Sequence, residues 1–149
     1  MMSKLNVAAN PQINVEIQSL LANGFVDSAF LIAVMGIEFL GAMVDDKPVR
    51  ANGQSSRRFK IGLRKFFPKR YGKPSITESI YKSLRCNVGH LLQFSSKIDF
   101  VDDSISHLIE EGVVLKISKK QFVKDYITAT DKLNQRLEEG IYLLKKGVV

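Results

Sequence analysis

Two residues in the middle of the chain, Arg85 and His90, have side chains suited to chemistry on a phosphate group. Histidine can gain or lose a proton near neutral pH, and the planar, permanently charged arginine side chain matches phosphate oxygens. Five residues turn an ideal α-helix by about 500°, which leaves these side chains roughly 140° apart around the helix. They therefore converge only if Arg85 curls back, if Gly89 loosens the helix, or if a second subunit completes the site.

The segment YKSLRCNVGH, residues 81–90, has an arginine, four intervening residues and a histidine, and this spacing resembles the signature of the HEPN family. The resemblance extends over residues 10–145 through the order of the elements, but only Arg85 to His90 is diagnostic. It implies a helical bundle that pairs as a homodimer, with the Arg and His of both subunits in one groove. Active members cleave RNA without a metal ion. By this resemblance His90 is the general acid or base, and Arg85 holds the scissile phosphate or stabilises its developing charge.

This chain departs from the family directly after the arginine. Active members commonly have a polar residue there, often Asn or Asp, whereas this chain has Cys86, with Asn87 one place later. Cys86 and His90 are four residues apart, so the residue after the arginine shares a helix face with the histidine. The thiol weakens the case for catalysis and leaves the case for the fold intact. A packing role for Cys86 is favoured over a Cys86–His90 dyad, because no second cysteine accompanies it.

Two side chains near this motif have simpler interpretations. His90 lies off the apolar stripe of Leu84 and Val88, and its alternative role is that of a solvated histidine or one that caps a carbonyl group. Glu38 lies in an apolar segment, so it needs a partner if it is buried. We predict Arg85 as the candidate partner of Glu38.

The net charge of +7 is concentrated between Lys47 and Lys73, where ten basic residues and no acidic ones occur. The rest of the chain has 12 basic and 15 acidic residues, a net charge of −3. This asymmetry indicates an anionic partner, RNA or another polyanion, whose binding would weaken steeply with salt. The candidate phosphate contacts are Arg57, Arg58, Arg64, Lys65 and Arg70.

The alternative for this basic segment is a solvated cationic surface packed from inside by Phe59, Phe66 and Phe67. These aromatic residues occupy the inward stripe of the expected helix. Only Tyr71, in a loop, is a reasonable candidate for stacking on a nucleic-acid base.

Other catalytic and cofactor sites have no support in the sequence. The ten glycines are scattered, and none opens the strand-to-helix unit of a phosphate-binding loop. His90 and His107 are the two histidines, and neither has a carboxylate pair at metal-ligand spacing. The single cysteine, Cys86, cannot form an internal disulfide. The sequence therefore predicts no metal ion and no cofactor.

The pattern of apolar residues and helix breakers predicts one domain over residues 1–149 that is mainly α-helical. The expected helices span residues 11–22, 25–45, 55–67 and 75–94, with a last one from 119 onward. Capping boxes at 75–78 and 118–121 predict two of the helix starts. Residues 95–103 are expected to form a connection, 113–117 a short strand, and 106–110 a hairpin partner. The inward face of the last helix is predicted to consist of Phe122, Tyr126, Ala129, Leu133, Leu137, Ile141 and Leu144. These elements predict an antiparallel helical bundle with a minor β element before the C-terminal helix.

The apolar stretch from Phe25 to Val44 approaches the length that spans a bilayer. Asp27, Ser28 and Glu38 interrupt it, and a charge near the bilayer centre costs several kcal/mol, so a buried central helix is favoured. The single cysteine gives no sign of an oxidising compartment, which favours a cytoplasmic location, and the N-terminus lacks the apolar core of a secretory signal.

The sequence thus supports a HEPN-like homodimer that binds RNA or another polyanion, with endoribonuclease activity open. The alternative is a non-catalytic dimerisation and interaction module. A small phage-defence or toxin component is compatible with either.

Overall fold

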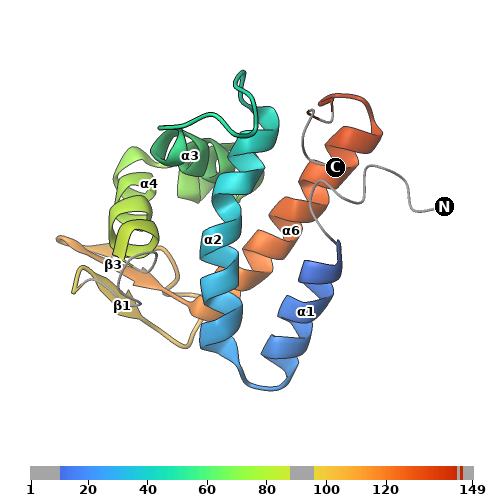
Figure 1. The fold of residues 1–149 in the computed structure, drawn as a ribbon. Coiled ribbons are helices and arrows are strands. Elements are labelled where there is room, and N and C mark those ends of the chain that lie inside the picture. Colours follow the sequence, from blue (N-terminus) through green and yellow to red (C-terminus); the bar gives the residue numbers. More distant parts are fainter. Residues whose placement is uncertain (1–10, 88–95, 144, 146–149) are drawn as a thin grey trace.

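The computed structural model describes residues 11–87, 96–143 and 145, and its fold is mainly helical with a small sheet before the last helix (Figure 1). The helices are α1 (Pro11–Ala22), α2 (Val26–Val44), α3 (Ser55–Phe66), α4 (Pro74–Ile80) and α6 (Lys119–Glu138). A 3₁₀ turn, η2 (Lys69–Gly72), joins α3 to α4, and a π-helical segment, η3 (Tyr81–Cys86), continues α4. The predicted fold class is therefore confirmed.

Helix α2 is the central element, as the apolar sequence of this segment predicts. In Figure 1 it runs through the middle of the molecule, with α1 beside it, α3 and α4 on the other side, and α6 behind. Glycines let α2 and α3 approach closely, because a Cβ atom on Gly62 would lie 2.5 Å from the carbonyl oxygen of Ile37. Within the described residues α2 is long and apolar enough to cross a membrane, but half of its most apolar window is buried inside the fold. The burial agrees with the predicted role as a core helix.

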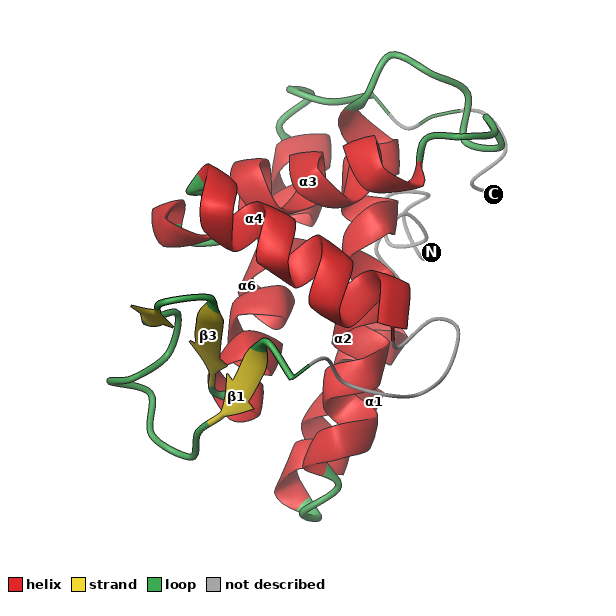
Figure 2. Ribbon diagram, turned by 90° about the vertical axis from the view of Figure 1, so that its left-hand side faces the viewer, coloured by secondary structure: helices red, strands yellow, loops and turns green. Residues whose placement is uncertain are grey.

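A three-stranded sheet follows η3 in the described part of the chain. It consists of β1 (Ile98–Phe100), β2 (Glu110–Glu111) and β3 (Val114–Ile117), in the order β1-β3-β2. β3 pairs in parallel with β1 and antiparallel with β2, and Figure 2 shows β1 and β3 side by side. The predicted strand and a hairpin before the last helix are confirmed, but the hairpin partner is Glu110–Glu111 rather than residues 106–110. The predicted connection over 95–103 is wrong, because β1 lies within it.

The ends of the later helices differ in part from the prediction. At α6 only half of the predicted capping box is present. The hydroxyl of Ser118 accepts a hydrogen bond from the amide of Gln121 at 3.2 Å, but the Ser118 amide donates to His107 and the Gln121 side chain to Asp125. At α4 the predicted capping box is absent, since the helix begins at Pro74 and the Ser75 hydroxyl donates to Glu110 instead. Helix α6 ends at Glu138, and Gly140 follows with a φ of +72°, a left-handed conformation that suits glycine. The predicted inward position of Ile141 is therefore wrong, because its side chain lies beyond the helix and is exposed. Leu144 lies outside the described residues.

Candidate functional site

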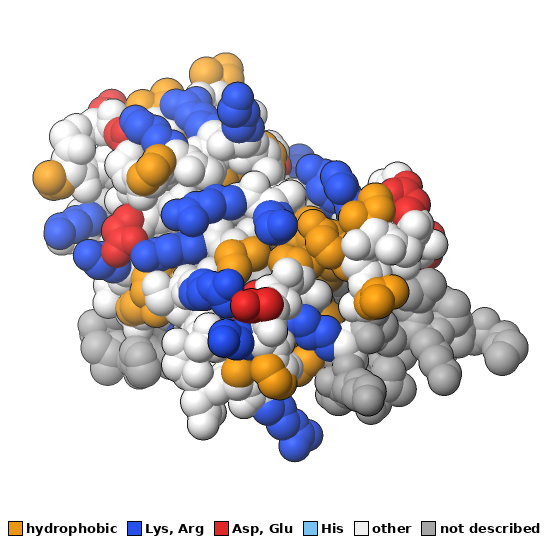
Figure 3. Space-filling model, turned by 90° about the horizontal axis from the view of Figure 1, so that it is seen from above, with side chains coloured by type: hydrophobic (Ala, Val, Ile, Leu, Met, Phe, Trp, Pro, Cys, Tyr) orange, Lys and Arg blue, Asp and Glu red, His pale blue; other side chains and the backbone are white. Residues whose placement is uncertain are grey.

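Basic side chains gather on one face of the molecule. Seen from above the view of Figure 1, Lys and Arg residues cover much of this face, and acidic residues are few (Figure 3). The structure also contains an open depression of about 780 Å³, lined by residues from α3, from the chain around η2 and from α6. Its lining consists of Arg64, Lys65, Phe67, Lys69, Arg70, Gly72, Lys73 and Lys132. We call this hollow the basic depression.

The cations of the basic depression are largely unneutralised. Lys73 forms an ion pair with Glu110 at 2.6 Å, and the ammonium of Lys65 lies 5.8 Å from the ring centroid of Tyr142. The other cationic side chains of the lining, Arg64, Lys69, Arg70 and Lys132, have no carboxylate within 4.0 Å in the described part of the chain, nor has Lys65. Three elements therefore bring positive charge to one hollow, and the Glu110 carboxylate that pairs with Lys73 also interacts electrostatically with Arg70. Lys132 lies outside the basic segment of the sequence and was not predicted.

Arg58 belongs to the fold rather than to this face. Its side chain is buried, and its Nε donates to Asp45 Oδ2 at 2.7 Å. Its terminal nitrogens donate to the carbonyl oxygens of Val49 and Pro48, each at 2.7 Å. The prediction that Arg58 contacts phosphate is therefore wrong, because a polyanion cannot reach a guanidinium enclosed by these groups.

Asp45 is the acidic centre of this buried network. Lys145 also donates to it at 2.6 Å, and Arg57 lies 3.8 Å away. Desolvation raises the pKa of Asp45, but hydrogen bonds from Arg58 and Lys145 outweigh it and lower the pKa to about 2. Arg57 is half exposed and pairs with Asp46 at 3.1 Å, so its charge is partly neutralised. Arg57 and Arg58 thus hold the loop after α2.

Tyr71 does not stack on bases, because its side chain is fully buried. Its hydroxyl donates to Asp125 Oδ2 at 2.6 Å and lies 2.6 Å from His107 Nε2. The amide of Ser118 donates to His107 Nδ1 at 3.0 Å, so Nδ1 is the acceptor and Nε2 carries the ring proton. Burial, together with the charge of Asp125, raises the pKa of Tyr71 well above its usual value. The cluster of Tyr71, His107 and Asp125 holds η2 in place. No local sequence signal predicted this cluster.

Arg85 forms the predicted ion pair with Glu38. Its Nε donates to Glu38 Oε2 at 3.1 Å, and the same oxygen accepts the Ser55 hydroxyl at 2.9 Å. The side chain of Arg85 is one-quarter exposed, and its terminal nitrogens have no hydrogen-bond partner among the described residues. Arg85 lies in the π-helical segment η3, a type of local irregularity that is frequent at functional sites.

The other half of the predicted catalytic pair, His90, lies outside the described residues. Cys86 ends η3, and both Cys86 and Asn87 are half-buried. The structure thus places Arg85 beside Glu38 and leaves the convergence of Arg85 with His90 untested.

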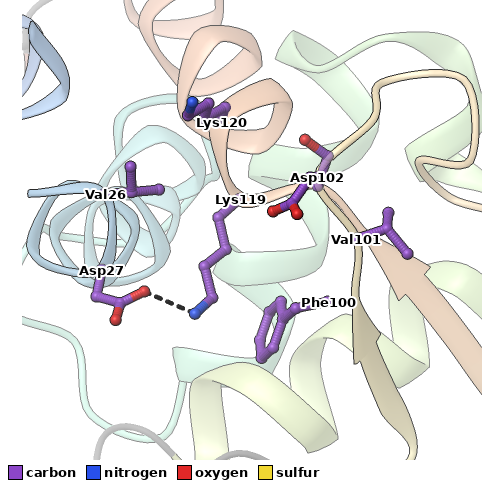
Figure 4. Close-up of a pocket in the computed structure, with 8 residues that line it drawn as sticks. Val26, Asp27, Phe100, Val101, Asp102, Lys119 and Lys120 are labelled. Atoms are coloured by element: carbon purple, nitrogen blue, oxygen red, sulfur yellow. Dashed lines mark hydrogen bonds and ion pairs between the residues drawn. The ribbon is translucent and has the colours of Figure 1, made fainter. Parts of the chain in front are cut away.

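A second hollow has balanced charge and serves as a contrast. It measures about 200 Å³ and lies at the start of α6, next to α2 and β1 (Figure 4). Lys119 donates to Asp27 at 2.6 Å and lies 4.2 Å from the ring centroid of Phe100, while Lys120 and Asp102 complete the charged lining. The lining thus contains two cations and two carboxylates. In the described residues no group of three or more His, Cys, Asp or Glu side chains could hold a metal ion.

Comparisons with protein-family models, curated proteins and solved structures find no match to this chain. The resemblance to the HEPN family therefore rests on the Arg85 to His90 segment and on the order of the elements. The structure itself shows a mainly helical fold with basic residues clustered around one depression.

Proposed function

We propose that this protein binds RNA, or more broadly a polyanion, through the basic depression. The observation that carries the proposal is the group of cations from α3, η2 and α6 that have no carboxylate partner among the described residues. Such cations attract phosphate groups and release the counterions that phosphates hold, which makes binding favourable and sensitive to salt. Because the predicted contact Arg58 is buried, the proposed contacts retained from the sequence are Arg64, Lys65 and Arg70, with Arg57 at the margin.

A salt titration of RNA affinity tests this proposal. We compare the wild type with Arg64→Ala/Arg70→Ala and with a control, Lys120→Ala/Lys124→Ala, which removes the same charge from exposed positions outside the depression. The first variant should lose affinity and lower the slope of log affinity against log salt by about one to two, whereas the control should change little. Equal losses in both variants would show that only net charge matters and would refute a site at the depression.

We further propose that the protein is a HEPN-like homodimer and a metal-independent endoribonuclease, with Arg85 and His90 of both subunits in a composite site. Two observations support this: Arg85 is partly exposed with free terminal nitrogens among the described residues, and it lies in an irregular helical segment. Glu38 holds Nε of Arg85, which would orient the guanidinium towards a phosphate. A cytoplasmic location and a role in phage defence or as a toxin are compatible with such an activity.

Cleavage of mixed RNA in EDTA by the wild type, His90→Ala and Arg85→Ala tests the catalytic proposal. Activity in the wild type that disappears in both variants, with circular dichroism unchanged, would support it. Gel filtration provides the companion measurement, because a strictly monomeric protein would exclude a composite site.

The alternative is a non-catalytic dimerisation and interaction module. The ion pair between Arg85 and Glu38 favours it, since the arginine already has a structural partner, and so does Cys86 at the position after the arginine. This alternative predicts salt-sensitive binding and no turnover in any of the three proteins.

A further inference from the structure

We infer that the basic depression is a site for an oligophosphate, a group of directly linked phosphates such as the 5′-triphosphate end of an RNA. This inference rests on the proposed polyanion binding and specifies which part of the polyanion the depression takes. It concerns the depression alone and does not involve Arg85 or His90.

The arrangement of the cations is the first argument. Six cationic side chains line one hollow of about 780 Å³, and they come from three separate elements rather than from one extended row. This volume lies within the range of roughly 300 to 1,000 Å³ that is usual for ligand pockets. A nucleic-acid backbone carries one charge per nucleotide along an extended path, whereas an oligophosphate concentrates several charges in a small volume. Cations that converge on a hollow therefore match the second kind of ligand better.

The types of side chain are the second argument. Arg64 and Arg70 come from α3 and from η2, and each has a planar guanidinium that can bind two phosphate oxygens at once. Lys65, Lys69 and Lys132 add compact charges that are not tied to one geometry. Adjacent phosphates offer many oxygens within reach of both kinds of donor.

The absence of a stacking surface among the lining residues is the third argument. Phe67 lines the depression but is only 3% exposed, and Tyr71 next to it is fully buried. The ring of Tyr142 lies near the ammonium of Lys65. Proteins that track single strands usually offer aromatic rings to successive bases. The lining of the depression therefore suits phosphate groups better than nucleic-acid bases.

The support beneath η2 is the fourth argument. Tyr71, between Arg70 and Gly72, is held through its hydroxyl by His107 and Asp125, and its carbonyl oxygen accepts the hydroxyl of Thr77 at 2.7 Å. The backbone that presents Lys69 and Arg70 is therefore fixed before a ligand arrives. A fixed backbone reduces the conformational entropy lost on binding, which favours a specific ligand over a diffuse one.

The experiment compares one RNA hairpin with three 5′ ends: hydroxyl, monophosphate and triphosphate. At moderate salt the triphosphate RNA should bind at least about tenfold more tightly than the hydroxyl RNA, because several charge-assisted hydrogen bonds are added. Arg64→Ala/Arg70→Ala should lose this preference, and Lys120→Ala/Lys124→Ala should keep it. Circular dichroism and thermal unfolding confirm that both variants fold.

Competition by inorganic tripolyphosphate and by GTP distinguishes the sources of the oligophosphate. Displacement of the triphosphate RNA by both competitors supports a site for linked phosphates whatever their carrier. Equal affinity for the three RNA ends would overturn the inference while leaving polyanion binding in place. Binding of tripolyphosphate without binding of any RNA would support the oligophosphate site and refute the proposed RNA binding.

Discussion

The two halves of the basic segment, Lys47 to Lys73, have different roles in the folded protein. In the first half, Arg57 and Arg58 face Asp45 and Asp46, and Arg58 is buried with every nitrogen of its guanidinium engaged. In the second half, Arg64 and its basic neighbours line an open hollow without carboxylate partners in the described residues. The same residue type thus stabilises a loop in one place and leaves charge available for a ligand a few residues later. Acidic residues near the start of the segment decide which arginines are neutralised.

The largest expected effect on stability comes from removing Asp45, the carboxylate that pairs with buried Arg58 in the first half of the basic segment. Asp45→Ala should lower the free energy of unfolding by about 3 to 5 kcal/mol, because it leaves the buried guanidinium of Arg58 without its counterion. Urea denaturation at neutral pH measures this loss. The matched substitution Asp46→Ala, at an exposed carboxylate, should cost less than about 1 kcal/mol. Similar losses for both would contradict the distinction between a buried and an exposed ion pair.

A smaller loss of stability is expected at Tyr71, which supports η2 in the second half of the basic segment. Tyr71→Phe should lower the free energy of unfolding by about 1 to 3 kcal/mol, because the buried Nε2–H of His107 loses its nearest acceptor and Asp125 loses a donor. Thermal or urea denaturation measures the change. As the control, Tyr81→Phe removes a hydroxyl that makes no hydrogen bond among the described residues. Unchanged stability in Tyr71→Phe would show that the cluster does not support η2.

The pH dependence of stability should also reveal the contribution of ionised Asp45. The pKa of Asp45 is about 2 in the folded protein, against an ordinary value of 3.8 that applies to the unfolded chain. The folded protein therefore favours the ionised form. Its stabilising contribution is present above pH 4 and is lost as the pH falls from about 4 to 2, by at most about 2 kcal/mol. Urea denaturation of the wild type and Asp45→Ala across this range measures it. The difference between the two proteins should shrink on acidification, and a constant difference would contradict the lowered pKa.

Much of the fold follows from local signals in the sequence. Helix α1 spans the predicted residues 11–22, between Pro11 and the Asn23-Gly24 pair, and Pro68 follows the end of α3. The ion pair of Glu38 with Arg85 was predictable because an ionisable side chain in an apolar helix needs a partner. These predictions succeeded because each depends on neighbours in the chain or on one strong energetic requirement.

Other features depend on contacts that the chain order does not reveal. The parallel pairing of β1 with β3 joins Ile98 to Leu115 across an intervening loop and β2, and the cluster of Tyr71, His107 and Asp125 joins three separate segments of the chain. For Arg58 a signal was present, since it lies four residues before Gly62 on the buried side of α3. The small glycine leaves room for close packing there, which places this arginine inside the fold.

The smallest effect on stability is expected in the open half, and its sign sharpens the contrast. Arg64→Ala/Arg70→Ala should change the free energy of unfolding by no more than about 0.5 kcal/mol, because both side chains are exposed and lack carboxylate partners in the described residues. At low salt the change should be a slight stabilisation, since removing two of the clustered cations relieves repulsion. Urea denaturation at low and high salt measures both parts, and high salt should abolish the gain. A loss above about 1 kcal/mol would mean that these arginines, like Arg58, hold the fold together.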